Sequence, residues 1–182
     1  MNLKEYQESA KRTMTYLGSH ELDTAHMLYG MMSEIVELMD AKDKVNAAEE
    51  IADVMWYVAN YASINGIGFE TIANVFEVNL DKIFGPVAKV DAINQLVCRI
   101  SFLTDHEKKE LAYKKHFPLV EKSMYLFEII KTVNWCFYYF TINPYEALQH
   151  NIDKLRVRYP EKFSEEKALN RNLTEERKAL EK

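Results

Sequence analysis

Two pairs of acidic residues constrain the fold of this chain more than any other feature. Glu34 and Glu37 form the first pair, Glu50 and Asp53 form the second, and both lie in otherwise apolar sequence. The i, i+3 spacing places both members of a pair on one face of a helix. Because the segment between the pairs, residues 40–46, is short and polar, we expect two antiparallel helices. Four carboxylates would then converge at the edge of a core, where a divalent cation would relieve their repulsion.

The composition favours an all-α fold. The chain has 182 residues, of which 48% are hydrophobic and only five are glycine and four proline. Such a profile favours helices over a turn-rich β fold, and the length allows one domain or two small coupled halves. The net charge of −5, without a basic stripe, argues against a nucleic-acid partner.

The sequence also predicts a cytoplasmic protein without a membrane partner. No apolar run approaches the ~18 residues of a membrane-spanning helix, and no secretory signal opens the chain. Cys98 and Cys136 lie in apolar helical sequence, so we expect both to be buried, reduced thiols.

Apolar periodicity, capping residues and stop signals predict a series of helices. The predicted ranges are 3–17, 23–40, 44–64, 69–84 (ended by Gly85-Pro86), 88–104, 119–141 and 144–158. The residues from Ser164 on are rich in charge, and we expect them to pack weakly or to fray.

An internal repeat indicates a tandem duplication. Residues 79–83 (NLDKI) recur as residues 151–155 (NIDKL), and a Val-x-Trp word recurs in the same order. We therefore interpret residues 88–158 as a second copy of residues 23–84; the alternative is chance similarity between two helical segments.

The second copy lacks the acidic pairs. Its positions that correspond to the four acids hold Arg99, Phe102, Ile129 and Thr132, and a one-residue shift recovers only one acid, Glu128. We expect residues 1–86 to form a helical unit with an intact metal site. Residues 87–160 would be a degenerate repeat packed on that unit, and residues 161–182 a charged tail.

The words around the acids resemble a known superfamily, the MazG-like, all-α nucleoside triphosphate pyrophosphohydrolases. Residues 34–38 (EIVEL) and 49–57 (EEIADVMWY) are similar to its ExxE…ExxD signature. This superfamily also includes the dimeric dUTPases, the dCTPases and the phosphoribosyl-ATP pyrophosphohydrolases.

Both ends of the chain resemble the same superfamily. Residues 3–7 (LKEYQ) with Thr13 resemble the first helix of small MazG-like proteins, and residues 151–160 (NIDKLRVRYP) with Phe163 resemble their C-terminal word. Members usually work as homodimers or tetramers of four-helix units. The resemblance therefore implies a MazG-like helical bundle, here a fused pseudo-dimer, with a homodimer of such chains as a possible assembly.

An all-carboxylate cluster suits Mg²⁺, with Mn²⁺ as a substitute. Zinc is disfavoured because no His or Cys accompanies the acids. A di-iron bundle would need Glu-x-x-His on two helices, and none of the five histidines follows a Glu at that spacing. No Gly-rich phosphate loop of the P-loop type occurs either.

With Mg²⁺, the natural substrate is a triphosphate, and the resemblance implies that it is a nucleoside triphosphate. The resemblance implies cleavage between the α and β phosphates, which gives a nucleoside monophosphate and pyrophosphate. Glu37 and Glu50 are candidates for the general base. The resemblance also assigns phosphate contacts to Lys154 and Arg158, and more weakly to Asn151.

Tyr57 and Asn60 continue the acidic face of their helix, where they would either contact the base or pack at the edge of the core. Two readings compete with that of an enzyme. One is a catalytically inactive nucleotide- or metal-binding sensor or interaction module of the same fold. The other is a purely structural bundle, which leaves four acids at the edge of the core unexplained.

Overall fold

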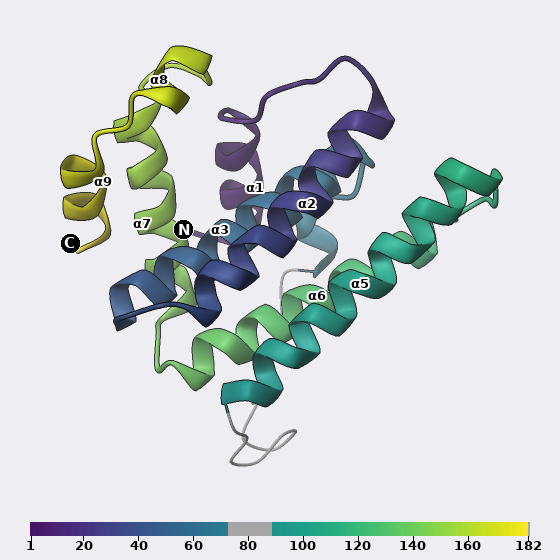
Figure 1. The fold of residues 1–182 in the computed structure, drawn as a ribbon, viewed down its shortest axis with the longest axis horizontal. Helices are drawn as coiled ribbons and strands as arrows, with labels where there is room; N and C mark the ends of the chain where they lie inside the picture. Colours follow the sequence, from purple (N-terminus) through teal and green to yellow (C-terminus); the bar gives the residue numbers. More distant parts are fainter. Residues whose placement is uncertain (73–88, 182) are drawn as a thin grey trace.

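The computed structural model describes residues 1–72 and 89–181, and within them the regular elements are helices (Figure 1). The all-α fold is therefore confirmed. The elements are α1 (Leu3–Lys11), α2 (His20–Met39), α3 (Lys44–Ile64), the 3-10 helix η1 (Phe69–Ile72), α5 (Lys89–Tyr113), α6 (Leu119–Tyr139), α7 (Pro144–Arg158), α8 (Glu165–Leu169) and α9 (Leu173–Leu180).

The α2–α3 hairpin forms as the two acidic pairs predicted. Helix α3 begins after Asp43, whose side chain accepts a hydrogen bond from the backbone N–H of Asn46 at 2.7 Å. This cap satisfies one of the free N–H groups that every helix start exposes. The short turn before Asp43 brings α3 back along α2, so the two acidic pairs lie on facing helices.

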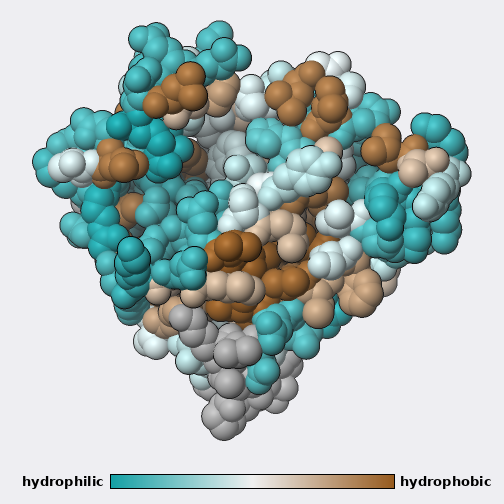
Figure 2. Space-filling model, in the orientation of Figure 1, coloured by the Kyte–Doolittle hydropathy of each residue, from teal (hydrophilic) through white to brown (hydrophobic). Residues whose placement is uncertain are grey.

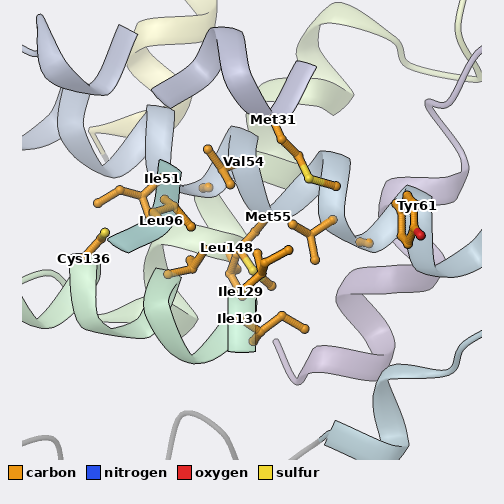
Figure 3. Packing of buried hydrophobic residues seen from close by; sticks show 14 of the residues in the cluster. Met31, Ile51, Val54, Met55, Tyr61, Leu96, Ile129, Ile130, Cys136 and Leu148 are labelled. Atoms are coloured by element: carbon orange, nitrogen blue, oxygen red, sulfur yellow. The ribbon is translucent and has the colours of Figure 1, made fainter. Parts of the chain in front are cut away.

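A second hairpin, α5–α6, packs against α3, and one hydrophobic cluster runs through both hairpins (Figure 3). Met55 of α3, Leu96 of α5, and Ile129 and Ile130 of α6 are completely buried in it. Each such side chain contributes about 1.5–3 kcal/mol relative to exposure. The residues on either side of the predicted boundary at 86 and 87 therefore share a core.

Helices α1 and α7 complete the bundle on the side of α3 that carries the second acidic pair. The hydroxyl of Tyr6 donates to the carbonyl of Ala52 at 2.9 Å and to Oδ1 of Asn151 at 3.0 Å. The side chain of Gln7 in turn donates to the carbonyl of Ile67 at 2.8 Å. Helix α1 is thus bound both to α7 and to the helix that carries Glu50 and Asp53.

Several local predictions were wrong. Helix α1 ends at Lys11 instead of extending to residue 17, and α2 begins at His20, capped by Ser19, rather than at residue 23. Helix α5 continues to Tyr113 rather than ending at residue 104. Its polar last part is stabilised by ion pairs between Asp105 and two lysines one turn further on.

The prediction of weak packing from Ser164 on was wrong for α9, whereas α8 has no buried residue. Residues of α9 pack against α7, and Glu176, Ala179 and Leu180 are buried. Cys136 is buried as predicted, whereas Cys98 is exposed on α5.

Two predictions concern residues outside those described. Of the helix predicted for residues 69–84, the structure describes only residues 69–72, which form the 3-10 helix η1. The first repeat word, residues 79–83, lies entirely outside the described residues. The tandem duplication therefore stays a prediction. Among the described residues, no helix combines the length and the apolar character that a membrane crossing needs.

Candidate metal centre

Three carboxylates from the facing helices α2 and α3 converge. Glu34, Glu50 and Asp53 each offer one oxygen, and these oxygens lie within 4.8 Å of one another. Glu50 is buried and the other two are partly buried. The i, i+3 spacing on α3 places two of the oxygens, and the antiparallel α2 brings the third against them.

The fourth predicted ligand, Glu37, lies at the edge of this cluster. Its side chain is exposed, and it is not among the acids whose oxygens meet. Its charge nevertheless acts on Glu34, one turn earlier on α2. Its roles as a metal ligand and as a general base stay predictions.

Two carboxylates of the cluster, those of Glu34 and Glu50, have a raised pKa. Burial is the largest cause that raises the pKa of Glu34 to about 9, and the charges of Asp53, Glu37 and Glu50 act in the same direction. Burial, followed by the charge of Asp53, raises the pKa of Glu50 to about 7. Such a set of mutually repelling, partly desolvated oxygens fits a hard divalent cation, which would replace the protons.

Asp53 is held by two side chains of α7. The Lys154 ammonium lies 2.5 Å from Oδ2 of Asp53 and 3.1 Å from Oε1 of Glu49. The amide of Asn151 donates to Oδ1 of Asp53 at 2.5 Å, while its own oxygen accepts from Tyr6. Both residues were predicted to bind substrate; the structure brings them to the metal centre as partners of Asp53, and a phosphate contact stays a prediction.

The Lys154 side chain remains charged despite its burial. Burial alone lowers the pKa of a lysine, but the charges of Asp53 and Glu49 outweigh it, so the pKa of Lys154 is raised. Because only 1% of the residue is exposed, these two carboxylates replace the water around its ammonium.

Two further residues of the centre, Asn46 and Glu49, were not among the predicted site residues. The Asn46 amide donates to Oε1 of Glu50 at 2.6 Å, and Glu49 pairs with Lys154. The available signal was their spacing, since Asn46 precedes Glu50 by four residues and Glu49 precedes Asp53 by four. Each pair therefore shares a face of α3.

A pocket of about 150 Å³ adjoins the acidic cluster. Its lining comes from the segment after α1, from α2 and α3, and from the end of α7 with the residues that follow it. The lining residues are Thr13, Thr15, His26, Glu34, Asp53, Trp56, Tyr57, Leu155, Arg158, Tyr159 and Phe163. The two terminal segments whose resemblance was noted in the sequence thus meet at this pocket.

Aromatic rings form one wall of the pocket. Tyr57 packs so closely on Gly30 that a Cβ built there would lie 2.1 Å from the ring. The Trp56 ring meets Tyr57 edge to face at 4.9 Å, and its N–H donates to Oγ1 of Thr13 at 3.0 Å. Trp56 is half-buried and lines the pocket.

The structure brings Arg158 to the pocket but not Asn60. The Arg158 guanidinium donates to both oxygens of Glu176 on α9. Asn60 is completely buried, its amide donates to the carbonyl of Trp56, and it is not among the residues that line the pocket. Its predicted contact with substrate therefore has no support from its position.

A larger pocket, of about 820 Å³, lies apart from these acids, between α2 and α5. On the face drawn in Figure 2, hydrophobic residues gather between the same two helices. The pocket contains another i, i+3 acidic pair, Glu107 and Glu110. The buried Lys122 ammonium lies 2.8 Å and 3.0 Å from their oxygens, so a lysine already neutralises much of their charge.

Comparison with known proteins identifies the first part of the chain. Residues 20–85 match the family model of the MazG nucleotide pyrophosphohydrolase domain. Searches of curated proteins and of solved structures gave no match. The matched segment contains all four acids of the two pairs, and the resemblance to the MazG-like superfamily that was drawn from the sequence is confirmed for residues 20–85.

Proposed function

We propose that this protein is a Mg²⁺-dependent nucleoside triphosphate pyrophosphohydrolase. It would cleave its substrate between the α and β phosphates and release a nucleoside monophosphate and pyrophosphate. The observation that carries the proposal is the convergence of Glu34, Glu50 and Asp53 beside a pocket lined by aromatic rings and Arg158. The family match supports hydrolysis of a nucleotide pyrophosphate bond.

The three converging acids, with Glu37 as a fourth at the exposed edge, would hold the cation. When bound, Mg²⁺ neutralises phosphate charge and favours attack by water. Lys154 and Asn151 keep Asp53 in one orientation through their hydrogen bonds to both of its oxygens. The geometry of the ligand set therefore depends on α7 as well as on α2 and α3.

Glu50 is the better supported of the two candidate general bases. Its pKa of about 7 lies close to the pH at which a base must gain and lose a proton. The Asn46 amide binds Oε1, which leaves the other oxygen for a water molecule or the cation. Glu37 is exposed and is not among the acids whose oxygens meet.

The pocket would receive the nucleotide next to the acids. The Arg158 guanidinium is a planar donor that suits a phosphate oxygen pair. Tyr57 and Trp56 offer ring surfaces against which a nucleobase can pack. These contacts would orient the triphosphate with its α and β phosphates over the carboxylates.

The experiment is a panel of nucleotides incubated with Mg²⁺ and resolved by chromatography. We expect monophosphate and pyrophosphate from one or a few nucleotides, with no product in EDTA. Glu50→Gln should lower the rate by at least about 100-fold, whereas Glu121→Gln, at an exposed position on α6, should not. Release of inorganic phosphate would mean that a different bond is cleaved. Nucleotide and Mg²⁺ binding without turnover would indicate the sensor instead.

A further inference from the structure

We infer that Glu176, on the C-terminal helix α9, is a positioning residue that holds the Arg158 guanidinium at the nucleotide pocket. This inference rests on the proposed function, in which Arg158 contacts the phosphates. It assigns a role to a segment beyond residues 20–85, which match the family model.

The contact between the two residues fixes the guanidinium in both direction and rotation. Nε of Arg158 lies 3.0 Å from Oε1 of Glu176, and Nη2 lies 2.5 Å from Oε2. A two-point contact of this kind orients a planar guanidinium more strictly than a single hydrogen bond does. Arg158 itself lines the pocket together with Glu34 and Asp53.

Glu176 is itself held in place. Only 2% of the residue is exposed, and Arg171 donates to its Oε2 at 2.8 Å from the other side. One carboxylate thus lies between two guanidinium groups, so the group of three keeps a net positive charge. The contact with Glu176 uses one edge of the Arg158 guanidinium, which also interacts with Tyr159; in the proposed function an anion in the pocket would bind the remaining N–H groups.

Helix α9 is also connected to the helix that carries the metal ligands. Nη2 of Arg177 lies 3.0 Å from Oδ2 of Asp43, the residue that caps the start of α3. Ala179 and Leu180 are buried, and α9 lies beside α7 in Figure 1. The position of Arg158 relative to Glu50 and Asp53 is therefore set partly by the C-terminal segment.

The test compares Glu176→Gln with Glu175→Gln. The first keeps the side-chain volume but removes the charged two-point contact; the second changes an exposed neighbour that pairs only with Lys178 among the described residues. We expect Glu176→Gln to raise KM about tenfold while kcat stays within about threefold. Glu175→Gln should leave both unchanged.

A double variant shows whether the effect passes through Arg158. If Glu176 acts by positioning, Arg158→Gln with Glu176→Gln should have the same KM as Arg158→Gln alone. Additive losses would overturn the inference, as would an unchanged KM in Glu176→Gln. A lower KM would also overturn it, because Glu176 would then be competing with phosphate for the guanidinium.

Two further measurements keep the inference testable. If Glu176→Gln does not fold, Glu176→Asp keeps the charge but shortens the reach, and it should raise KM in the same way. If the wild-type protein hydrolyses no nucleotide, the proposed function fails, and calorimetry with Mg²⁺ and tripolyphosphate then tests the positioning role. Weaker binding of tripolyphosphate to Glu176→Gln than to wild type supports that role, and equal binding overturns it.

Discussion

The buried ammonium of Lys154 lies 2.5 Å from Oδ2 of Asp53, across 101 residues of sequence. It lies 3.1 Å from Oε1 of Glu49 as well, so α7 supplies the positive charge that the acidic face of α3 requires. This lysine is the cationic partner of Asp53, and Asn151 binds the other oxygen of the same carboxylate. The stability of the bundle and the geometry of the metal centre therefore depend on the same side chain.

Replacement of Lys154 should destabilise the metal-free protein. In Lys154→Met, Asp53 and Glu49 lose a buried positive partner, and removal of one member of such a pair costs about 3–5 kcal/mol. Urea unfolding in EDTA should show this loss, and Mg²⁺ should restore more stability to the variant than to wild type. Arg156→Met, on the exposed face of α7, should change the free energy of unfolding by less than about 0.5 kcal/mol. Unchanged stability with a raised KM would instead make Lys154 a substrate ligand.

The pKa values of Glu34 and Glu50 predict how the metal-free protein responds to pH. Both values lie above the ordinary value of 4.5, at about 9 and about 7. The folded state therefore binds protons that the unfolded state has released. The contribution of the protonated Glu34 and Glu50 to the free energy of unfolding is complete below about pH 4.5. It is lost as the pH rises through about 7 for Glu50 and then about 9 for Glu34. The Tm in EDTA should fall as the pH rises across this window.

Mg²⁺ should reverse that trend, because the cation binds the deprotonated carboxylates and its affinity rises with pH. The increase in Tm on addition of Mg²⁺ should be larger at about pH 9 than at about pH 6. Glu34→Gln with Glu50→Gln should remove most of the pH dependence between about pH 5 and pH 9. A Tm in EDTA that rises with pH would contradict the burial of these acids.

The features that local sequence could predict are those that depend on neighbouring residues. The spacing of Glu50 and Asp53, the Asp43 cap and the polar turn before it determine the α2–α3 hairpin, and the hairpin brings the acids together. Periodicity failed where charge pairing extends a helix, as in α5 after residue 104. The sequence of a polar segment does not show whether its charged side chains will be solvated or will form ion pairs along a helix.

The partners of the site residues could not be predicted because they come from distant parts of the chain. Nothing near Asn151 in the sequence shows that its amide binds Asp53 rather than a phosphate. The same holds for Arg158 and Glu176, since the charge-rich C-terminal segment resembles a solvated tail until its carboxylate is placed against the guanidinium. The family resemblance was enough to predict some residues of the pocket, but their contacts became known only from the fold.

Gly30→Ala should displace the Tyr57 ring. A Cβ at this position would lie 2.1 Å from the ring, which borders the pocket and has to move. We expect a loss of about 1–3 kcal/mol of stability from the overpacking and a higher KM for the nucleotide. Urea unfolding and steady-state kinetics measure the two effects.

A double-mutant cycle of Gly30→Ala and Tyr57→Ala tests whether the Tyr57 ring causes the loss of stability. In the Tyr57→Ala background the three atoms nearest to the added Cβ are removed, so Gly30→Ala should become stabilising by about 1 kcal/mol, because alanine is the better helix former. If Gly30→Ala remains destabilising without the ring, another contact is responsible.

Lys122→Met should destabilise the bundle at a place remote from the acidic cluster. The Lys122 ammonium lies 2.8 Å from Glu107 and 3.0 Å from Glu110, and it donates to Asn65 at the end of α3. Its loss would leave Glu107 buried beside a second carboxylate, at a cost of about 3–5 kcal/mol in urea unfolding. Lys108 pairs with Asp105 on the surface of α5, so Lys108→Met should cost less than about 1 kcal/mol.

Mg²⁺ should raise the Tm of Lys122→Met as much as that of wild type, because the variant leaves the cluster on α2 and α3 intact. A weakened response to Mg²⁺ would show that the two acidic sites are coupled through α3.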